Sequence, residues 1–281
     1  KKEKKERKEK IDKDLEEALI EGYYIYAADL VETEGATLEN IINPRDVSRL
    51  VDYILENNPD YALAHTINAL LKYEKKDYLG AKAELETNYH IKALVIKCDI
   101  SDEEEVKQMI KTINKELGNI DVLINNAGIA IDSTLEDKRV EDFKRILEVN
   151  LIGTYNTCKL IGTKMFKKKE GSIVNISSTN GIDSYYPYSM DYDASKAGVI
   201  SLTHNFAVSY SPYIRVNSIA PGWVNTEMNK ELDEEYVKEE CKHILLDRFA
   251  EPEEIAKEIY HVAVESTYLN DSIIKVDGGR Y

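Results

Sequence analysis

Cysteine and histidine are scarce in this sequence, which has three cysteines and five histidines among 281 residues. Cys98, Cys158 and Cys241 lie far apart and form no CxxC pair, so they indicate neither a disulfide framework nor a zinc site. The sequence brings histidine, cysteine and aspartate together in no metal-ligand pattern, and we expect no metal. We interpret the cysteines as buried thiols.

Long apolar runs and an excess of basic residues are also missing. No stretch approaches the roughly 18 apolar residues of a membrane span, and no signal peptide is visible. The 37 Lys and Arg against 52 Asp and Glu give a net charge of −15, which argues against nucleic acid and anionic membranes as partners. With 43% hydrophobic residues for a core, we expect a soluble cytoplasmic protein.

Tyr192 and Lys196 are the residues around which the chemistry is organised. They are four residues apart in a predicted helix and therefore share one face. A neighbouring ammonium lowers the pKa of a phenol from about 10, which makes tyrosine usable as a general acid or base. An isolated pair of this kind would most often be an exposed helical pair.

Polar clusters at the ends of three predicted strands favour a site instead. The run 171–178 delivers Ser178, the run 215–220 stops at Pro221-Gly222, and the run 121–125 leads into Asn126-Ala127-Gly128. Open α/β sheets bind ligands outside the carboxyl ends of their strands. These segments therefore predict one site.

From about residue 87 to 281 the sequence resembles the short-chain dehydrogenase/reductase family, close to its 3-oxoacyl reductase-like members. The motifs that carry the resemblance are Asn125–Gly128, Asn150 in Val149–Thr154, Ser178, Tyr192-x-x-x-Lys196, Pro221-Gly222 with Thr226, and Val276–Gly279. The resemblance implies an α/β fold with a Rossmann-like doubly wound parallel sheet. It also implies NAD(P)-dependent hydride transfer between the nicotinamide and a carbonyl or alcohol carbon.

The resemblance assigns four catalytic residues. Tyr192 exchanges the proton with the substrate oxygen, and Ser178 hydrogen-bonds that oxygen. Lys196 lowers the tyrosine pKa and binds the nicotinamide ribose, while Asn150 positions a water that links Lys196 to solvent. These contacts need heavy atoms about 2.6–3.2 Å apart.

The same resemblance assigns the cofactor-binding residues. Besides Tyr192 and Lys196, they are Asp99, Asn126, Ala127, Gly128, Pro221, Gly222, Val224 and Thr226. Asp99 matches the position that contacts adenine, and a role in a turn or helix cap is compatible with it. Gly128 would allow close approach of the cofactor, with a purely conformational glycine as the alternative.

One part of the family pattern is missing: no TGxxxGxG turn occurs before residue 90. That turn wraps the cofactor pyrophosphate, and its absence predicts a sheet that lacks its first two strands. The segment 91–98 then reads as the third strand. We expect weak binding of NADP or NAD. A catalytically impaired chimera, or a helical-repeat interaction protein that lacks the glycine-rich loop, stays open as the alternative to an active oxidoreductase.

Residues 1–86 predict an all-α helical segment, and 87–281 the truncated reductase domain. Residues 58–86 resemble one partial tetratricopeptide repeat, which predicts either a groove for a peptide partner or a hairpin that covers apolar surface. Beyond it we expect helices over 102–117, 138–168 with interruptions near Gly153 and Gly162, 193–209 and 251–264, a substrate-side segment over 225–245, and a last strand over 272–276.

The substrate predicted by the resemblance is a small-molecule or acyl-thioester carbonyl compound. Ser211-Pro212-Tyr213 occupies a stretch that is often basic in enzymes that meet an acidic acyl carrier, which disfavours such a carrier here. The helices over 138–168 and 193–209 and the last strand form the subunit contacts of the family, so we expect a symmetric homo-oligomer.

Overall fold

The computed structural model describes Leu79, Lys82, Ala83, Glu86 and residues 91–226, 229 and 232–280. The chain divides into two units, 1–95 and 96–281, and the fold below is that of the second. The helices predicted before residue 79 and most of the partial tetratricopeptide repeat lie outside the described residues. The domain boundary between residues 86 and 87 therefore stays a prediction.

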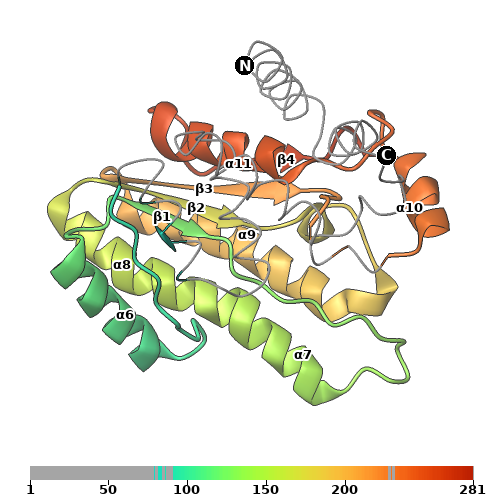
Figure 1. Cartoon of the computed structure of the whole chain (residues 1–281), viewed down its shortest axis with the longest axis horizontal. Helices are drawn as coiled ribbons and strands as arrows, with labels where there is room; N and C mark the ends of the chain where they lie inside the picture. Colours follow the sequence, from blue (N-terminus) through green and yellow to red (C-terminus); the bar gives the residue numbers. More distant parts are fainter. Residues whose placement is uncertain are drawn as a thin grey trace, which may run out of the picture. The chain divides into compact units, whose positions relative to one another are not determined.

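A four-stranded parallel sheet organises the second unit (Figure 1). Its strands are β1 (Val122–Asn125), β2 (Gly171–Ile176), β3 (Ile214–Pro221) and β4 (Ile273–Val276), and they lie in the order of the sequence. The register places Asn125 beside Asn175 and Asn175 beside Ser218, so the polar strand ends meet at one edge. Parallel neighbours need crossover connections, which are helical here. The predicted Rossmann-like α/β fold is confirmed.

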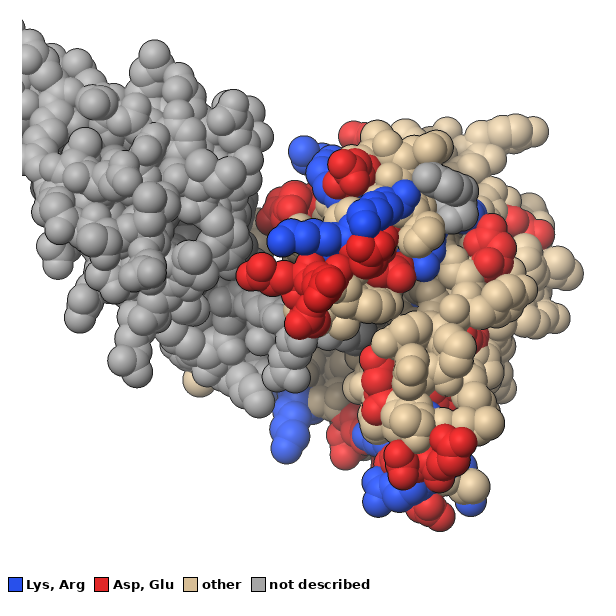
Figure 2. Space-filling model, turned by 90° about the vertical axis from the view of Figure 1, so that its right-hand side faces the viewer, with Lys and Arg blue, Asp and Glu red and all other residues tan. Residues whose placement is uncertain are grey.

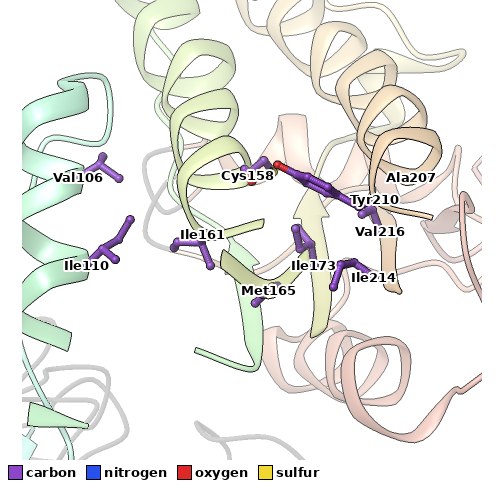
Figure 3. Packing of buried hydrophobic residues seen from close by; sticks show 10 residues of the cluster. All are labelled: Val106, Ile110, Cys158, Ile161, Met165, Ile173, Ala207, Tyr210, Ile214 and Val216. Carbon is purple, nitrogen blue, oxygen red and sulfur yellow. Dashed lines mark hydrogen bonds between the residues drawn. The ribbon is translucent and has the colours of Figure 1, made fainter. Parts of the chain in front are cut away.

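Apolar side chains alternate between the two faces of the sheet, as the period of a strand requires. Ile173 belongs to a core cluster on one face, and Val174 to a cluster on the other. The first cluster packs under α6 (Glu103–Glu116), α8 (Thr154–Lys168) and α9 (Met190–Tyr210). Figure 3 shows the Tyr210 hydroxyl near Cys158, to whose carbonyl oxygen it donates at 3.1 Å. The second cluster lies against α11 (Pro252–Tyr260), and α10 (Glu234–Cys241) precedes it in the chain.

Capping residues and proline mark the starts of two helices. Asp102 caps α6 by accepting hydrogen bonds from the backbone of Glu104 and Glu105. Pro252 opens α11, and Glu251 and Glu254 form a capping box there. None of the helices in the described part of the chain is long and apolar enough to cross a membrane.

The helix predicted over 138–168 is divided once rather than twice. α7 (Val140–Leu147) runs into a π-helix, Glu148–Gly153, and then into α8. Gly162 lies inside α8 without interrupting it, because the glycine makes room for Tyr210: a Cβ there would lie 2.4 Å from a ring carbon. The predicted break at Gly162 is therefore wrong, and close packing explains the glycine.

The prediction of a strand over 91–98 is also wrong, since these residues adopt no regular secondary structure. A strand needs a neighbour for its backbone N–H and C=O groups. Within the described ranges, β1 has a partner strand only on its β2 side. Val122 on β1 keeps 38% of its surface exposed and Ile124 37%, which is high for the strand of a doubly covered sheet.

The cysteines are free thiols, but only Cys158 is fully buried. Burial raises the pKa of the Cys158 thiol to about 12, so this thiol is unreactive at neutral pH. Cys98 and Cys241 are half-buried, which corrects the expectation of burial for these two.

Candidate active site

Three strand ends and the start of α9 meet at the carboxyl edge of the sheet. β1 leads into Asn126–Gly128, β2 into Ser177-Ser178, and β3 ends at Pro221. Of the four predicted catalytic residues, Asn150, Ser178 and Lys196 are buried, and Tyr192 is partly buried. The structure thus collects the predicted catalytic residues from four segments of the chain.

The Ser178 hydroxyl lies close enough to the Tyr192 phenol to act on its pKa. Ser178 precedes a 3-10 turn, Thr179–Gly181, and its Oγ accepts from the backbone N–H of Asn180 at 3.2 Å. A Cβ on Gly181 would lie 2.7 Å from the backbone carbon of Lys196. This close approach of turn and helix lets the serine reach the tyrosine.

The electrostatics of Tyr192 differ from the prediction. Burial raises the pKa of the phenol to about 12, the nearby Ser178 hydroxyl opposes the rise, and the carboxylate of Asp193 adds to it. The predicted lowering of this pKa by Lys196 is wrong for this arrangement. Desolvation of the phenolate outweighs the other interactions, so the phenol is protonated at neutral pH and ready to donate.

Lys196 lies beside the tyrosine as its i+4 spacing predicts. Its Nζ lies 5.4 Å from the centre of the Tyr192 ring and donates to the carbonyl oxygen of Ile176 at 2.7 Å. Burial lowers the pKa of Lys196 to about 8. A lysine of this kind is close to titration at neutral pH and can pass a proton on.

Asn150 lies in the π-helix and connects several parts of the site. Short π-helices are frequent at functional sites. Its Oδ1 accepts from the backbone N–H of Ile129 at 2.8 Å, and its Nδ2 donates to Ile129 O at 2.9 Å and to Ser195 Oγ at 3.0 Å. Ser195 in turn donates to the carbonyl oxygen of Tyr192 at 2.7 Å. The amide therefore ties the segment after β1 to α9, and its role toward a water stays a prediction.

Gly128 borders the space between Asn150 and Lys196. A Cβ at Gly128 would lie 3.4 Å from Asn150 Oδ1 and 3.5 Å from Lys196 Nζ, in ordinary contact with both polar groups. Asn126 and Ala127 precede it directly at the end of β1. The residues present fit the ribose and nicotinamide end of a dinucleotide, which needs hydroxyl, ammonium and backbone groups at this edge.

The stretch after β3 lies at the same edge. The backbone N–H of Gly222 donates to Val276 O at 3.0 Å, and that of Thr226 to Val224 O at 2.9 Å. A Cβ on Gly222 would lie 2.8 Å from the Asp277 Cβ, which explains the glycine by close approach of the two segments. Pro221 is the last residue of β3, and the stretch 221–226 leaves the sheet at the site.

Asp99 has the structural role that the sequence left open. Its carboxylate accepts from the backbone N–H and Oγ of Ser101 and pairs with Arg145 at 2.8 Å. These hydrogen bonds hold the pKa of Asp99 at about 2. Contact with adenine stays a prediction, and it would have to use this pair or the backbone.

The sequence reasoning missed the two carboxylates that flank Tyr192. Asp193 accepts from Asn180 Nδ2 at 2.7 Å and from the backbone N–H of Tyr186 at 3.0 Å. Asp191 pairs with Lys138 Nζ at 2.9 Å. The sequence feature that could have identified them is a pair of acidic residues in the first turn of the helix that carries the proposed general acid. Carboxylates at this position complement the helix dipole.

A cluster of aromatic side chains follows β3. Trp223 stacks on Phe249 with ring centres 5.3 Å apart, and its Nε1 donates to Glu240 of α10 at 2.7 Å. Tyr236 of α10 packs edge-on against Trp223, with ring centres 6.1 Å apart. On the face drawn in Figure 2, which includes α10, the described basic side chains lie next to acidic ones.

Among the described residues no group of three or more His, Cys, Asp or Glu could hold a metal ion.

Comparison with known proteins identifies the class. A family model described as short chain dehydrogenase matches residues 64–237. The 3-oxoacyl-[acyl-carrier-protein] reductase FabG of Thermotoga maritima is 39% identical over 183 residues, which cover 64% of this chain and 74% of that protein. Carbonyl reductase family member 4 of Xenopus tropicalis is 40% identical over 187 residues, covering 66% and 77%.

Comparison with solved structures supports the same class of protein. A gluconate 5-dehydrogenase from Burkholderia cenocepacia J2315, in complex with NADP and tartrate, superposes with a TM-score of 0.62 at 29% identity. The match covers 64% of this chain and 72% of that one. The chain belongs to the short-chain dehydrogenase family and is an oxidoreductase of that family.

Proposed function

We propose that the protein reduces a carbonyl group, or oxidises the corresponding alcohol, with NAD(P) as cofactor and Tyr192 as the general acid or base. The contact of Ser178 with Tyr192 beside the buried Lys196 carries this proposal. A serine hydroxyl and a protonated phenol that lie close together can both bind one carbonyl oxygen. The NADP-bound relative supports the choice of cofactor.

The chain's own residues supply orientation and the proton. Ser178 and Tyr192 hold the substrate oxygen, and the Tyr192 hydroxyl gives its proton as charge develops there. When bound, the nicotinamide supplies or accepts the hydride. Lys196 binds the ribose hydroxyls and, with its pKa near 8, returns a proton toward the phenolate. Through its hydrogen bonds, Asn150 holds the segment 128–131 against α9.

Cofactor affinity is the weak point of this site. The pyrophosphate needs backbone N–H donors or cations in place of water, and the sequence has no TGxxxGxG turn before residue 90. Each charge-assisted hydrogen bond is worth about 1.5–3 kcal/mol, so losing two or three weakens binding by roughly two to five orders of magnitude. We expect turnover only at high cofactor concentration. A micromolar or tighter dissociation constant in a fluorescence titration with NADPH or NADH would contradict this expectation.

The substrate is a small-molecule or acyl-thioester carbonyl compound. The names of the 3-oxoacyl and carbonyl reductase relatives support both. α10 carries four glutamates against one lysine, which disfavours delivery on an acidic carrier protein. The expectation that carrier delivery is disfavoured can be tested by comparing kcat/KM for three substrates. They are a free 3-oxoacyl thioester, the same acyl group on a carrier protein, and a small ketone.

Tyr192→Phe is the direct test of the mechanism, because it removes only the hydroxyl. We expect reduction to fall by at least about a hundredfold, the usual contribution of a positioned acid. The matched control is Tyr268→Phe, since Tyr268 is fully exposed in a loop away from the site. Retained reduction by Tyr192→Phe would overturn the assignment of the proton donor.

A further inference from the structure

A buried ion pair joins the substrate side of the site to the helix of the general acid. Lys138 Nζ lies 2.9 Å from Asp191 Oδ2 and 3.1 Å from Asp191 Oδ1. The Lys138 side chain is 6% exposed and that of Asp191 0%. The other ion pairs found among the described residues involve at least one partner with clearly greater exposure, so this pair is distinct.

Lys138 is bound to the segment that follows β1. Its ammonium also donates to the carbonyl oxygen of Ile131 at 2.5 Å. The same segment is fixed at Ile129 by Asn150 and at Ser133, whose backbone N–H donates to Tyr188 O at 2.9 Å. Lys138 therefore completes the attachment of residues 129–133 between two contacts that the backbone already makes.

Asp191 lies in the first turn of α9, directly before Tyr192. Its Oδ1 accepts from the backbone N–H of Tyr192 at 3.0 Å as well as from Lys138. A carboxylate at this position complements the positive end of the helix dipole. The ion pair thus connects residues 129–133 to the backbone of the general acid through one carboxylate.

Stability alone is a poor reason for this pair. Desolvating two charges offsets most of their attraction, and apolar pairs of similar volume often leave a protein as stable or make it more stable. Removing one partner alone is strongly destabilising because a buried charge is left unpaired. What an apolar pair cannot reproduce is the set of directional hydrogen bonds to Ile131 and Tyr192.

We propose that Lys138 and Asp191 are positioning residues that hold the segment 129–133 against the first turn of α9 and so place Tyr192 for proton transfer. Neither residue touches the substrate oxygen. The structural part of the proposal stands on the contacts above. Its kinetic part rests on the proposed function, so the two are tested separately.

The test uses the double variant Lys138→Met/Asp191→Leu, which leaves no buried charge unpaired. We expect the single variant Lys138→Met to lower the melting temperature and the double variant to regain it. Amide hydrogen exchange at Ile129 and Ser133 should be at least tenfold faster in the double variant than in the wild type. Unchanged exchange at these two amides would overturn the proposal.

The kinetic readout separates positioning from folding. In the double variant we expect kcat to stay at least tenfold below the wild type while KM for the carbonyl compound changes less than threefold. The control is Lys168→Met/Asp121→Leu, an exposed pair at the amino end of β1, which should alter neither exchange nor kcat. Wild-type kcat in a stable double variant would overturn the proposal. If the wild type shows no turnover but the exchange result holds, the proposed function fails and the positioning of residues 129–133 stands.

Discussion

Lys196 Nζ lies 5.4 Å from the centre of the Tyr192 ring and donates its hydrogen bond to Ile176 O rather than to the phenol oxygen. The lysine is therefore anchored to the end of β2, while the tyrosine phenol lies near the Ser178 hydroxyl. Both groups have pKa values shifted toward their neutral forms by burial. This arrangement suits proton donation by a neutral phenol with a readily titrated amine nearby.

The buried Lys196 predicts a pH-dependent stability. Its pKa is lowered to about 8 in the folded protein from the ordinary 10.5, so between these values the unfolded chain binds more protons. Stability then rises with pH in that window, and below about pH 8 the full penalty of the buried charge is present. Relative to Lys196→Met, the wild type should gain roughly 2 kcal/mol between about pH 7.5 and 9.5 in urea unfolding. A difference that is constant with pH would contradict the burial of this amine.

Asp193→Asn should shift the pH profile of reduction. The Asp193 carboxylate raises the pKa of Tyr192, so its neutral replacement lowers that pKa. Reduction needs the protonated phenol, and its loss at basic pH should therefore begin at lower pH in the variant. The control is Asp183→Asn, since Asp183 is exposed and pairs with Lys275. A basic limb that moves to higher pH, or not at all, would contradict the assigned influence of Asp193.

Two glycine substitutions separate packing near the site from packing elsewhere. Gly181→Ala forces the turn after Ser178 away from α9, whereas Gly162→Ala forces α8 away from Tyr210. Each should destabilise the protein by about 1–3 kcal/mol, the usual effect of overpacking. Only Gly181→Ala should also lower kcat per folded molecule, because it separates Ser178 from Tyr192. Equal kinetic effects of the two variants would speak against this coupling.

We expect a symmetric homo-oligomer, most simply a dimer or tetramer, as the sequence predicted. Apolar residues on the outer sides of α8 and α9 support this, including Val208 with 74% of its surface exposed and Tyr155 with 40%. Val208→Glu should shift the light-scattering mass toward the monomer. A wild-type monomer at micromolar concentration would count against the prediction.

The sequence predicted most of the sheet, and it predicted residues that the structure brings together at one edge, because strand ends and the i, i+4 spacing of Tyr192 and Lys196 are local signals. It failed where the outcome depends on distant neighbours. Ile91–Cys98 has the apolar pattern of a strand but no strand partner in the described part of the chain. Gly162 and the Lys138–Asp191 pair depend on residues about 50 positions away, which no local pattern shows. The pKa of Tyr192 was mispredicted because burial of the phenol and the Asp193 carboxylate both raise it.

The central claim is that this chain transfers a hydride between NAD(P) and a carbonyl carbon with Tyr192 as the acid. The most direct measurement uses NADPH deuterated at the transferable position of the nicotinamide, at millimolar concentration so that weak binding does not hide turnover. Mass spectrometry of the product from a ketone or 3-oxoacyl thioester then reports the transfer. We predict a deuterated alcohol with the wild type and its loss with Tyr192→Phe. A wild type that yields no deuterated alcohol above the protein-free control, or a Tyr192→Phe variant that yields as much as the wild type, would contradict the account.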